Sequence, residues 1–274
     1  MTQGFIRVNG VRLWYEDTGS GKAVTLVHAG IADHRQWDEQ VPALAEYYRV
    51  IRYDMRGFGQ SEIKPGEASL SDDIRGVLDA LGVERTALMG CSMGGAASID
   101  FAVTYPERVG ALITVGSGLS GAPDHNNPSE QVAVMEEAEA AQKAGDIARL
   151  TEIEARYWCQ GFARSADQVK PSVMKRFLEM ESNNNRRYVA GEWEGAEFPP
   201  LDPPAFGRLG SLTLPTLVIV GSGDEAAVQA MADDIANGIP GARKVVMEGL
   251  GHVPNMDEPE EFNRIILEFL RSVW

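Results

Sequence analysis

The chain has 274 residues, of which 44% are hydrophobic and 24% charged, and its formal net charge is −15. This length and composition suit one large α/β domain with room for an inserted subdomain. The strong negative charge argues against nucleic acids and anionic membrane surfaces as partners. There is no apolar run long enough for a membrane span and no leader-like start. Two cysteines, Cys91 and Cys159, favour a reducing cytoplasm over a disulfide framework.

The first part of the chain predicts strands that alternate with helices. Asn9-Gly10 is a strong two-residue turn signal, so residues 5–8 and 11–16 are expected to pair as a hairpin. Further strands are expected over 23–28, 48–53, 85–89 and 111–115, and helices over 37–48, 70–81 and 93–105. This alternation indicates an α/β fold with a mostly parallel sheet covered by helices on both faces.

The alternation stops near residue 118 and resumes at Leu214. The intervening segment predicts helices over 129–144, 146–159 and about 165–181, the last opened by a capping-box pattern at 165–168. We therefore predict a helical cap, residues 119–209, inserted into a core formed by residues 1–118 and 210–274. Strands over 216–220 and 242–247 and helices over 225–239 and 259–273 are expected to complete that core.

The motif Gly90-Cys91-Ser92-Met93-Gly94 has a Gly-x-Ser-x-Gly pattern and lies between an expected strand and an expected helix. A sharp strand-to-helix turn strains the serine backbone, and small residues two before and two after it prevent a clash. The free amides and the positive dipole end of the following helix then point at the reaction centre. Ser92 is the predicted nucleophile.

A serine hydroxyl needs a base and an orienting carboxylate. Of the four histidines, His252 directly follows the last expected strand and is the best candidate base. Asp224 follows the preceding strand, whereas Asp257 and Glu258, although close to His252 in sequence, are expected to begin the last helix. Loops after parallel strands converge at one edge of the sheet, so a triad of Ser92, Asp224 and His252 is predicted.

These residues, together with the His28 loop and the segment 54–61, resemble the α/β-hydrolase superfamily, in its group of small bacterial esterase-like and lactonase-like proteins. The resemblance implies the α/β-hydrolase fold, a twisted sheet with an inserted helical cap, and no cofactor or metal. It assigns the oxyanion hole to the backbone amides of Gly30 and Met93 and makes His28 a support of that loop. Relatives often carry an aromatic residue where Gly30 stands, so Ile31 is an alternative donor.

The expected function is a serine hydrolase that cleaves small to medium carboxylic esters or lactones through an acyl-enzyme. A carbon–carbon bond hydrolase or a perhydrolase using the same triad is the alternative, and a non-catalytic ligand sensor is a third. Ile31, Trp37 and Trp158 are expected to line the substrate pocket. A small molecule is the only predicted partner, and monomer and homodimer both stay open.

Two residue groups near the site are expected to be structural. Asp54 and Arg56 should brace the site as a buried ion pair or through loop hydrogen bonds, with Ser61 in the same network. Cys91 should pack as a small apolar side chain rather than act as a thiol.

Overall fold

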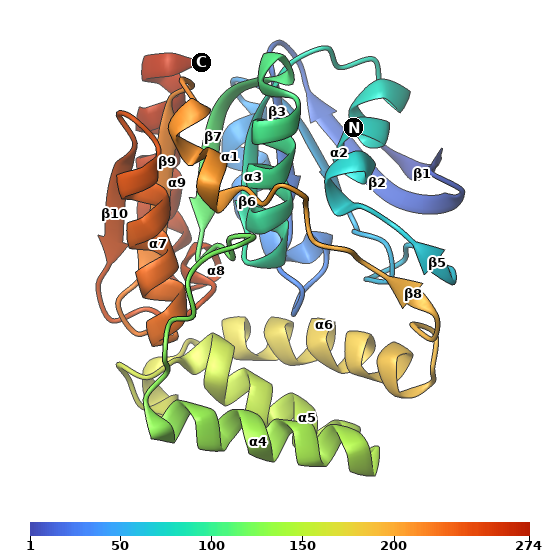
Figure 1. Cartoon of the computed structure of the whole chain (residues 1–274), viewed down its shortest axis with the longest axis vertical. Coiled ribbons are helices and arrows are strands. Elements are labelled where there is room, and N and C mark those ends of the chain that lie inside the picture. Colours follow the sequence, from blue (N-terminus) through green and yellow to red (C-terminus); the bar gives the residue numbers. More distant parts are fainter.

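The computed structural model describes all residues 1–274 and contains one twisted eight-stranded sheet in the order β1-β2-β4-β3-β6-β7-β9-β10 (Figure 1). Two pairings are antiparallel: β1 (Thr2–Val8) with β2 (Val11–Gly19), and β2 with β4 (Arg49–Tyr53). The parallel part adds β3 (Ala23–Val27), β6 (Thr86–Cys91), β7 (Val109–Val115), β9 (Thr216–Gly221) and β10 (Arg243–Met247). The predicted fold class is confirmed.

Helices cover both faces of this sheet, and side chains of its central strands alternate between two hydrophobic cores. Within β6, Leu88 belongs to one core and Met89 to the other. The first core also receives side chains of α2 (Leu70–Ala80), α3 (Met93–Thr104) and α7 (Ala226–Gly238). The second receives those of α1 (Gln40–Ala45), α8 (Pro254–Asp257) and α9 (Pro259–Val273).

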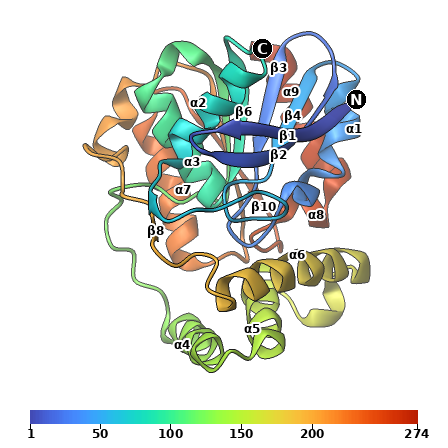
Figure 2. The same ribbon diagram turned by 90° about the vertical axis from the view of Figure 1, so that its right-hand side faces the viewer.

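A helical layer lies beyond one end of the sheet (Figures 1 and 2). It consists of α4 (Ser129–Ala144), α5 (Ile147–Glu154), a π-helical turn η3 (Ala155–Gln160) and α6 (Pro171–Val189), all within the predicted cap segment. After α6 the chain forms the short strand β8 (Ala196–Glu197), which pairs in parallel with β5 (Gly66–Glu67) of the core. The 3-10 helix η5 (Phe206–Ser211) then leads to β9. No helix has the length and apolar character that crossing a membrane requires.

Three helix predictions differ from the structure in their bounds. The helix expected over 37–48 is split into a 3-10 turn η1 (His34–Trp37) and the short α1. The turn begins before the expected helix because the Asp33 side chain caps it by accepting from Arg35 N–H at 2.9 Å. The second cap helix changes to π-helix after Glu154. The third begins only at Pro171, since the Ser165 N–H···Oε1 Gln168 bond of 2.8 Å closes a separate 3-10 turn, η4 (Ala166–Gln168).

Candidate active site

Ser92 connects β6 to α3 through a strained turn. Its backbone has φ 54° and ψ −118°, a conformation that is rare for a residue with a side chain. Three backbone hydrogen bonds hold it there: Ser92 N–H donates to Val115 O at 2.9 Å, and Ser92 O accepts from Ala96 N–H at 2.9 Å and Gly118 N–H at 3.2 Å. The strain is thus maintained by both neighbouring elements, as expected for a functional position.

The glycines on either side of Ser92 are required by close backbone packing. A Cβ at Gly90 would lie 2.2 Å from Gly94 O, and a Cβ at Gly94 would lie 2.3 Å from His28 O. Both atoms belong to the backbone and cannot move away as a flexible side chain could. The requirement for small residues that the motif predicts is therefore present in the structure.

Asp224 and His252 come together after the last two strands of the sheet. His252 Nδ1 lies 2.9 Å from each carboxylate oxygen of Asp224, and both side chains are almost completely buried. His252 N–H donates to Trp158 O at 3.0 Å, and the Trp158 ring lies 4.6 Å from the imidazole. The carboxylate fixes the proton on Nδ1, and no hydrogen bond of the protein uses Nε2, so that nitrogen can accept a proton.

Ser92, at the turn after β6, makes no hydrogen bond to His252. Cys91 Sγ is 3.8 Å from His252 O, which places the two segments in contact. A Cβ at Gly116 would be 3.0 Å from Asp224 Oδ2 and 3.1 Å from His252 Nδ1. The strand ends therefore converge as predicted. Catalytic hydrogen bonds are often long in ligand-free enzymes and tighten when substrate binds.

The segment proposed to bind the oxyanion packs against the residue after Ser92. A Cβ at Gly30 would lie 2.9 Å from Met93 Cε, so the two residues are adjacent. Neither Gly30 N–H nor Ile31 N–H donates to another backbone group. The Ser92 hydroxyl likewise makes no hydrogen bond that would cap the N-terminus of α3. Both amides of the His28 loop are thus free, and the choice between Gly30 and Ile31 stays a prediction.

His28 braces this loop as a neutral imidazole. Its Nε2 accepts the N–H of Met55 at 2.9 Å, so the proton is on Nδ1, which donates to Ala29 O at 2.7 Å. Burial lowers the pKa of His28 and keeps the ring uncharged. Ala29 N–H donates to Gln36 Oε1 at 2.8 Å. The His28 loop is therefore fixed by hydrogen bonds from the His28 ring and from the Ala29 amide.

A cavity of about 230 Å³ separates this loop from the cap. Gly30, Ile31 and Met93 border it from the core. The cap contributes Gln142 from α4, Glu154 from α5, and Glu181, Asn184, Asn185 and Tyr188 from α6, while Phe58 and Trp193 complete the wall. None of the residues lining it is a lysine, arginine or histidine. Its volume is below the ~300–1,000 Å³ of typical ligand pockets, which favours a small group.

Of the three predicted pocket residues, the structure places one at this cavity. Ile31 lines it. Trp158 is beside the His252 ring instead. Trp37 does not line the cavity: the 3-10 turn η1 places its side chain in the second core, where it is fully buried. The prediction for Trp37 is corrected accordingly.

Sequence reasoning missed the polar residues of α6. The buried stripe of this helix begins with Val173, Phe177 and Met180 and continues with Glu181 and Asn184 at the same helical spacing. A buried stripe that changes from apolar to polar along one helix was the available signal. It indicates a place where the cap meets something other than the core.

Glu154 of α5 and Glu181 of α6 place two carboxyl groups at this cavity. Burial, followed by the neighbouring Glu154, raises the pKa of Glu181 well above its usual range, and burial raises that of Glu154. Each of the two carboxyl groups accepts a hydrogen bond from a neighbouring asparagine of α6. Asn185 Nδ2 donates to Glu154 Oε2 at 2.6 Å, and Asn184 Nδ2 to Glu181 Oε2 at 3.3 Å.

This pair predicts a pH-dependent stability. Because the folded-state pKa of Glu181 is raised, its contribution to folding is fully present below the usual glutamate pKa and is lost as pH rises through the folded value. Glu181→Gln cannot ionise, so we expect its Tm to exceed that of wild type at pH 8 by about 2–4 °C. At pH 5 the difference should shrink.

Thermal unfolding followed by circular dichroism at both pH values checks this expectation. The exposed Glu152, also on α5, supplies the control variant Glu152→Gln. A Tm difference between Glu181→Gln and wild type that is independent of pH would contradict the raised folded-state pKa of Glu181.

The segment around Asp54 is structural, with one corrected pairing. Arg56 forms its buried ion pair with Asp73 of α2 and not with Asp54. Asp54 instead accepts from His34 Nδ1 at 2.7 Å, and its carbonyl accepts from Ser61 Oγ at 2.6 Å. The hydrogen bonds expected within this loop are therefore present, whereas the ion pair of Arg56 is made with Asp73 and not with Asp54.

The cluster of Asp33, His34 and Asp54 brings possible metal ligands within 4.8 Å of one another. The Asp33 carboxylate binds the Arg35 guanidinium, with Nη2 to Oδ2 at 2.6 Å. Asp54 Oδ1 accepts from His34 and Oδ2 from Gln60 N–H at 2.9 Å. The ligand atoms already have partners from the protein, so the cluster is explained by its own hydrogen bonds.

Cys91 adjoins the nucleophile but is completely buried. Burial raises the pKa of its thiol to about 12, which disfavours the thiolate at neutral pH. The side chain belongs to the second hydrophobic core. These properties agree with the expected role as a small apolar residue.

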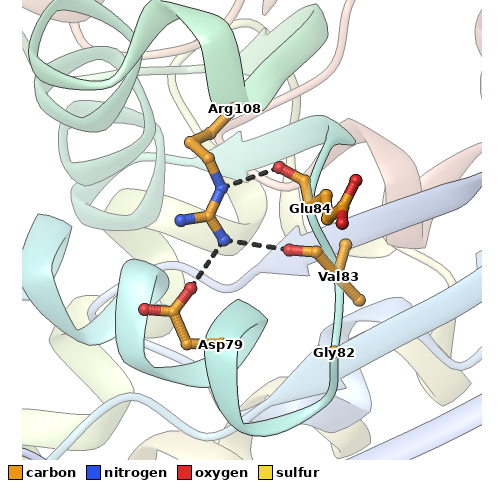
Figure 3. A pocket seen from close by; sticks show the side chains of 5 residues that line it. All are labelled: Asp79, Gly82, Val83, Glu84 and Arg108. Carbon is orange, nitrogen blue, oxygen red and sulfur yellow. Dashed lines mark hydrogen bonds and ion pairs between the residues drawn. The ribbon is translucent and has the colours of Figure 1, made fainter.

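A separate hollow of about 470 Å³ lies at Asp79, Gly82, Val83, Glu84 and Arg108 (Figure 3). The Arg108 guanidinium bonds to Asp79 Oδ1 at 2.7 Å and to the carbonyls of Val83 and Glu84 at 2.9 and 2.7 Å. This hollow precedes the start of β6 and β7, whereas ligands of parallel sheets bind beyond the carboxyl ends of the strands. It is a braced loop junction away from Ser92.

Comparison with known proteins identifies the same protein family that the architecture of the sheet and helices indicates. The family model described as alpha/beta hydrolase fold matches residues 22–259. The chain belongs to this family, and it is an α/β-hydrolase whose relatives are named as hydrolases.

Similar proteins differ in their named substrates. The chain is 30% identical over 272 residues to a 2-hydroxy-6-oxononadienedioate/2-hydroxy-6-oxononatrienedioate hydrolase of Burkholderia vietnamiensis, covering 95% of this chain and 91% of the relative. It is similar to a thermophilic esterase from Thermogutta terrifontis (TM-score 0.77, 29% identity, 100% and 99% covered). The enol-lactonase of Burkholderia xenovorans LB400 shares the fold (TM-score 0.78, 24% identity, 98% and 100% covered).

Proposed function

We propose that this protein is a serine hydrolase that cleaves small carboxylic esters or lactones with Ser92, His252 and Asp224. The observation that carries the proposal is the buried His252–Asp224 hydrogen bond at 2.9 Å beside the strained Ser92 turn. A histidine oriented in this way is the base that a serine nucleophile requires. The two free cysteines of the chain, Cys91 and Cys159, are consistent with action in the cytoplasm.

The reaction follows from these groups. Ser92 Oγ attacks the substrate carbonyl carbon while its proton passes to His252 Nε2, and Asp224 stabilises the resulting imidazolium. The amides of Met93 and Gly30 stabilise the oxyanion. The intermediate then expels the alcohol, which takes the proton from His252, and leaves an acyl-enzyme. Water then attacks the acyl-enzyme and gives a proton to His252. As this second intermediate collapses, His252 returns the proton to Ser92 Oγ, and the acid and the free serine are released.

The charge of the cavity favours esters or lactones over the dienedioates named for the relatives. A dienedioate carries two carboxylates, and binding them in a small cavity calls for cationic partners. No cationic side chain lines the cavity, and it contains Glu154 and Glu181. Carbon–carbon bond hydrolysis on the same triad is therefore the less favoured alternative.

Hydrolysis of p-nitrophenyl acetate and butanoate tests the proposal. We expect wild type to release p-nitrophenol and Ser92→Ala to lose at least a thousandfold in kcat, because the adjoining Cys91 thiol is completely buried and cannot replace the hydroxyl. Ser211→Ala, an exposed serine ahead of β9, is the matched control and should retain full activity.

Labelling with a fluorophosphonate separates an enzyme from a ligand sensor. Mass spectrometry should find the adduct on Ser92 in wild type and in Ser211→Ala, and not in Ser92→Ala. Equal hydrolysis by Ser92→Ala and wild type would reject Ser92 as the nucleophile. Folded wild type that takes no label and cleaves neither ester would favour a sensor.

A further inference from the structure

The cavity beside Gly30 and Met93 has a polar side formed by two cap helices. Glu181 is 3% exposed and Asn184 is 7% exposed, and both side chains border the cavity together with Glu154. Buried polar groups are costly unless they are hydrogen-bonded. A cap whose only task was to cover the site would place apolar residues here, as α6 does at Val173 and Phe177.

Asn184 has an acceptor atom without a partner. Its Nδ2 donates to Ala32 O at 3.1 Å and to Glu181 Oε2 at 3.3 Å, which sets the orientation of the amide. Its Oδ1 is buried and accepts no hydrogen bond. A carbonyl oxygen without a protein partner can accept a hydrogen bond from a bound group, and Asn184 borders the cavity next to the proposed oxyanion loop.

The other groups at the cavity share one chemical preference. The carboxyl groups of Glu154 and Glu181 are acceptors when ionised, and no positively charged side chain lines the cavity to balance them. Phe58, Tyr188 and Trp193 border the same space, and the Phe58 and Trp193 ring centroids are 5.0 Å apart in an edge-to-face arrangement. Carboxylates combined with aromatic faces are the surroundings that an ammonium group prefers.

We propose that this cavity binds a protonated amine of the substrate, with Glu154, Glu181 and Asn184 Oδ1 as acceptors and the aromatic rings around it. The substrate class is thereby narrowed to esters or lactones that carry an ammonium group. This inference rests on the proposed function for the position of the reacting carbonyl. The net charge of −15 adds a long-range attraction for cations.

The proposal also requires a pH dependence. In the free protein Glu154 and Glu181 hold protons more tightly than usual, so an ammonium group competes with those protons. The polar groups that border the same cavity are Gln142 from α4 and Asn184, Asn185 and Tyr188 from α6, with the Ala32 carbonyl bound by Asn184. Tyr188 is the only one of these that is titratable, and no lysine, arginine or histidine lines the cavity, so ammonium affinity should rise with pH until the pair is ionised.

Ligand-observed NMR with three probes of similar size tests the inference without turnover. The probes are n-butylammonium, 1-butanol and butanoate, which present a cationic donor, a neutral donor and an anion. We expect wild type at pH 8 to bind n-butylammonium at least tenfold more tightly than either other probe. The affinity should fall severalfold at pH 5.5.

Variants locate the binding. Glu181→Gln and Glu154→Gln should each reduce the preference for n-butylammonium over 1-butanol at least fivefold. Glu152→Gln, which removes an exposed carboxylate from the same helix as Glu154, should leave that preference unchanged. A similar loss in all three variants would show a general charge effect and overturn the proposed site.

The probes also distinguish the competing outcomes. Equal affinity for n-butylammonium and 1-butanol would overturn the ammonium preference in favour of a neutral hydroxyl site. Tightest binding of butanoate would overturn it in favour of carboxylate substrates. Either result leaves the function proposed for Ser92 intact, because fluorophosphonate labelling measures that function independently.

Discussion

Asp224→Asn is expected to lower kcat for p-nitrophenyl butanoate by about four orders of magnitude. The carboxylate accepts from His252 Nδ1 through both oxygens at 2.9 Å, which keeps the proton on Nδ1 and leaves Nε2 basic. An asparagine can donate from its amide to Nδ1 and so favours the tautomer with the proton on Nε2. That tautomer cannot accept the Ser92 proton. KM should change much less than kcat, since Asp224 is not at the cavity.

Asp257→Asn is the matched comparison because Asp257 is also buried and lies five residues after His252. Its carboxylate binds Arg164 Nη2 at 2.6 Å and makes no bond to His252. We expect this variant to lose stability and to keep kcat within about tenfold of wild type. Steady-state kinetics at 25 °C with thermal unfolding of both variants separates the two roles. A larger loss of kcat in Asp257→Asn would reassign the orienting carboxylate.

Gly94→Ala is expected to destabilise the protein by about 3 kcal/mol or more and to abolish activity. The added methyl group would lie 2.3 Å from His28 O and 2.5 Å from Val27 O. Relief requires α3 to move away from β3, and this movement would displace Ser92 from the proposed oxyanion loop. A lowering of Tm by about 10 °C is expected.

Gly118→Ala is the control for this substitution. A Cβ at Gly118 meets only Ala96 Cβ at 3.5 Å and Ser92 O at 3.9 Å, which are ordinary contacts. Its Tm should remain within a few degrees of wild type. Differential scanning calorimetry of both variants provides the comparison, and equal Tm values would refute the packing explanation of the motif.

The proposed substrate preference depends on residues from separate elements. Glu154 and Glu181 lie on different cap helices, and Phe58 comes from the core. A relative at 30% identity is named as a hydrolase of dienedioates and a similar structure at 29% identity as an esterase, so family membership alone does not determine what this cavity accepts. The electrostatics of the cavity walls is what distinguishes the candidate substrates.

Local signals in the sequence were sufficient for the fold class and for much of the candidate site. Asn9-Gly10 predicted the hairpin, and strand–helix alternation predicted the parallel sheet, because both patterns depend on near neighbours in the chain. Gly90 and Gly94 marked the Ser92 turn, because a Cβ at Gly90 would clash with Gly94 O only four residues away. Residues that directly follow strands, such as Asp224 and His252, could be placed at one sheet edge by topology alone.

Only the tertiary structure decided which distant side chains meet. The direction of Trp37 depends on a capped 3-10 turn, and the partner of Arg56 is Asp73 on a separate helix, so neither was readable from spacing. The half-buried Glu154 and the buried Glu181 come together because α5 and α6 pack against each other. Charge and shape of a cavity arise from surfaces that folding brings into contact, and no short segment of the sequence contains that information.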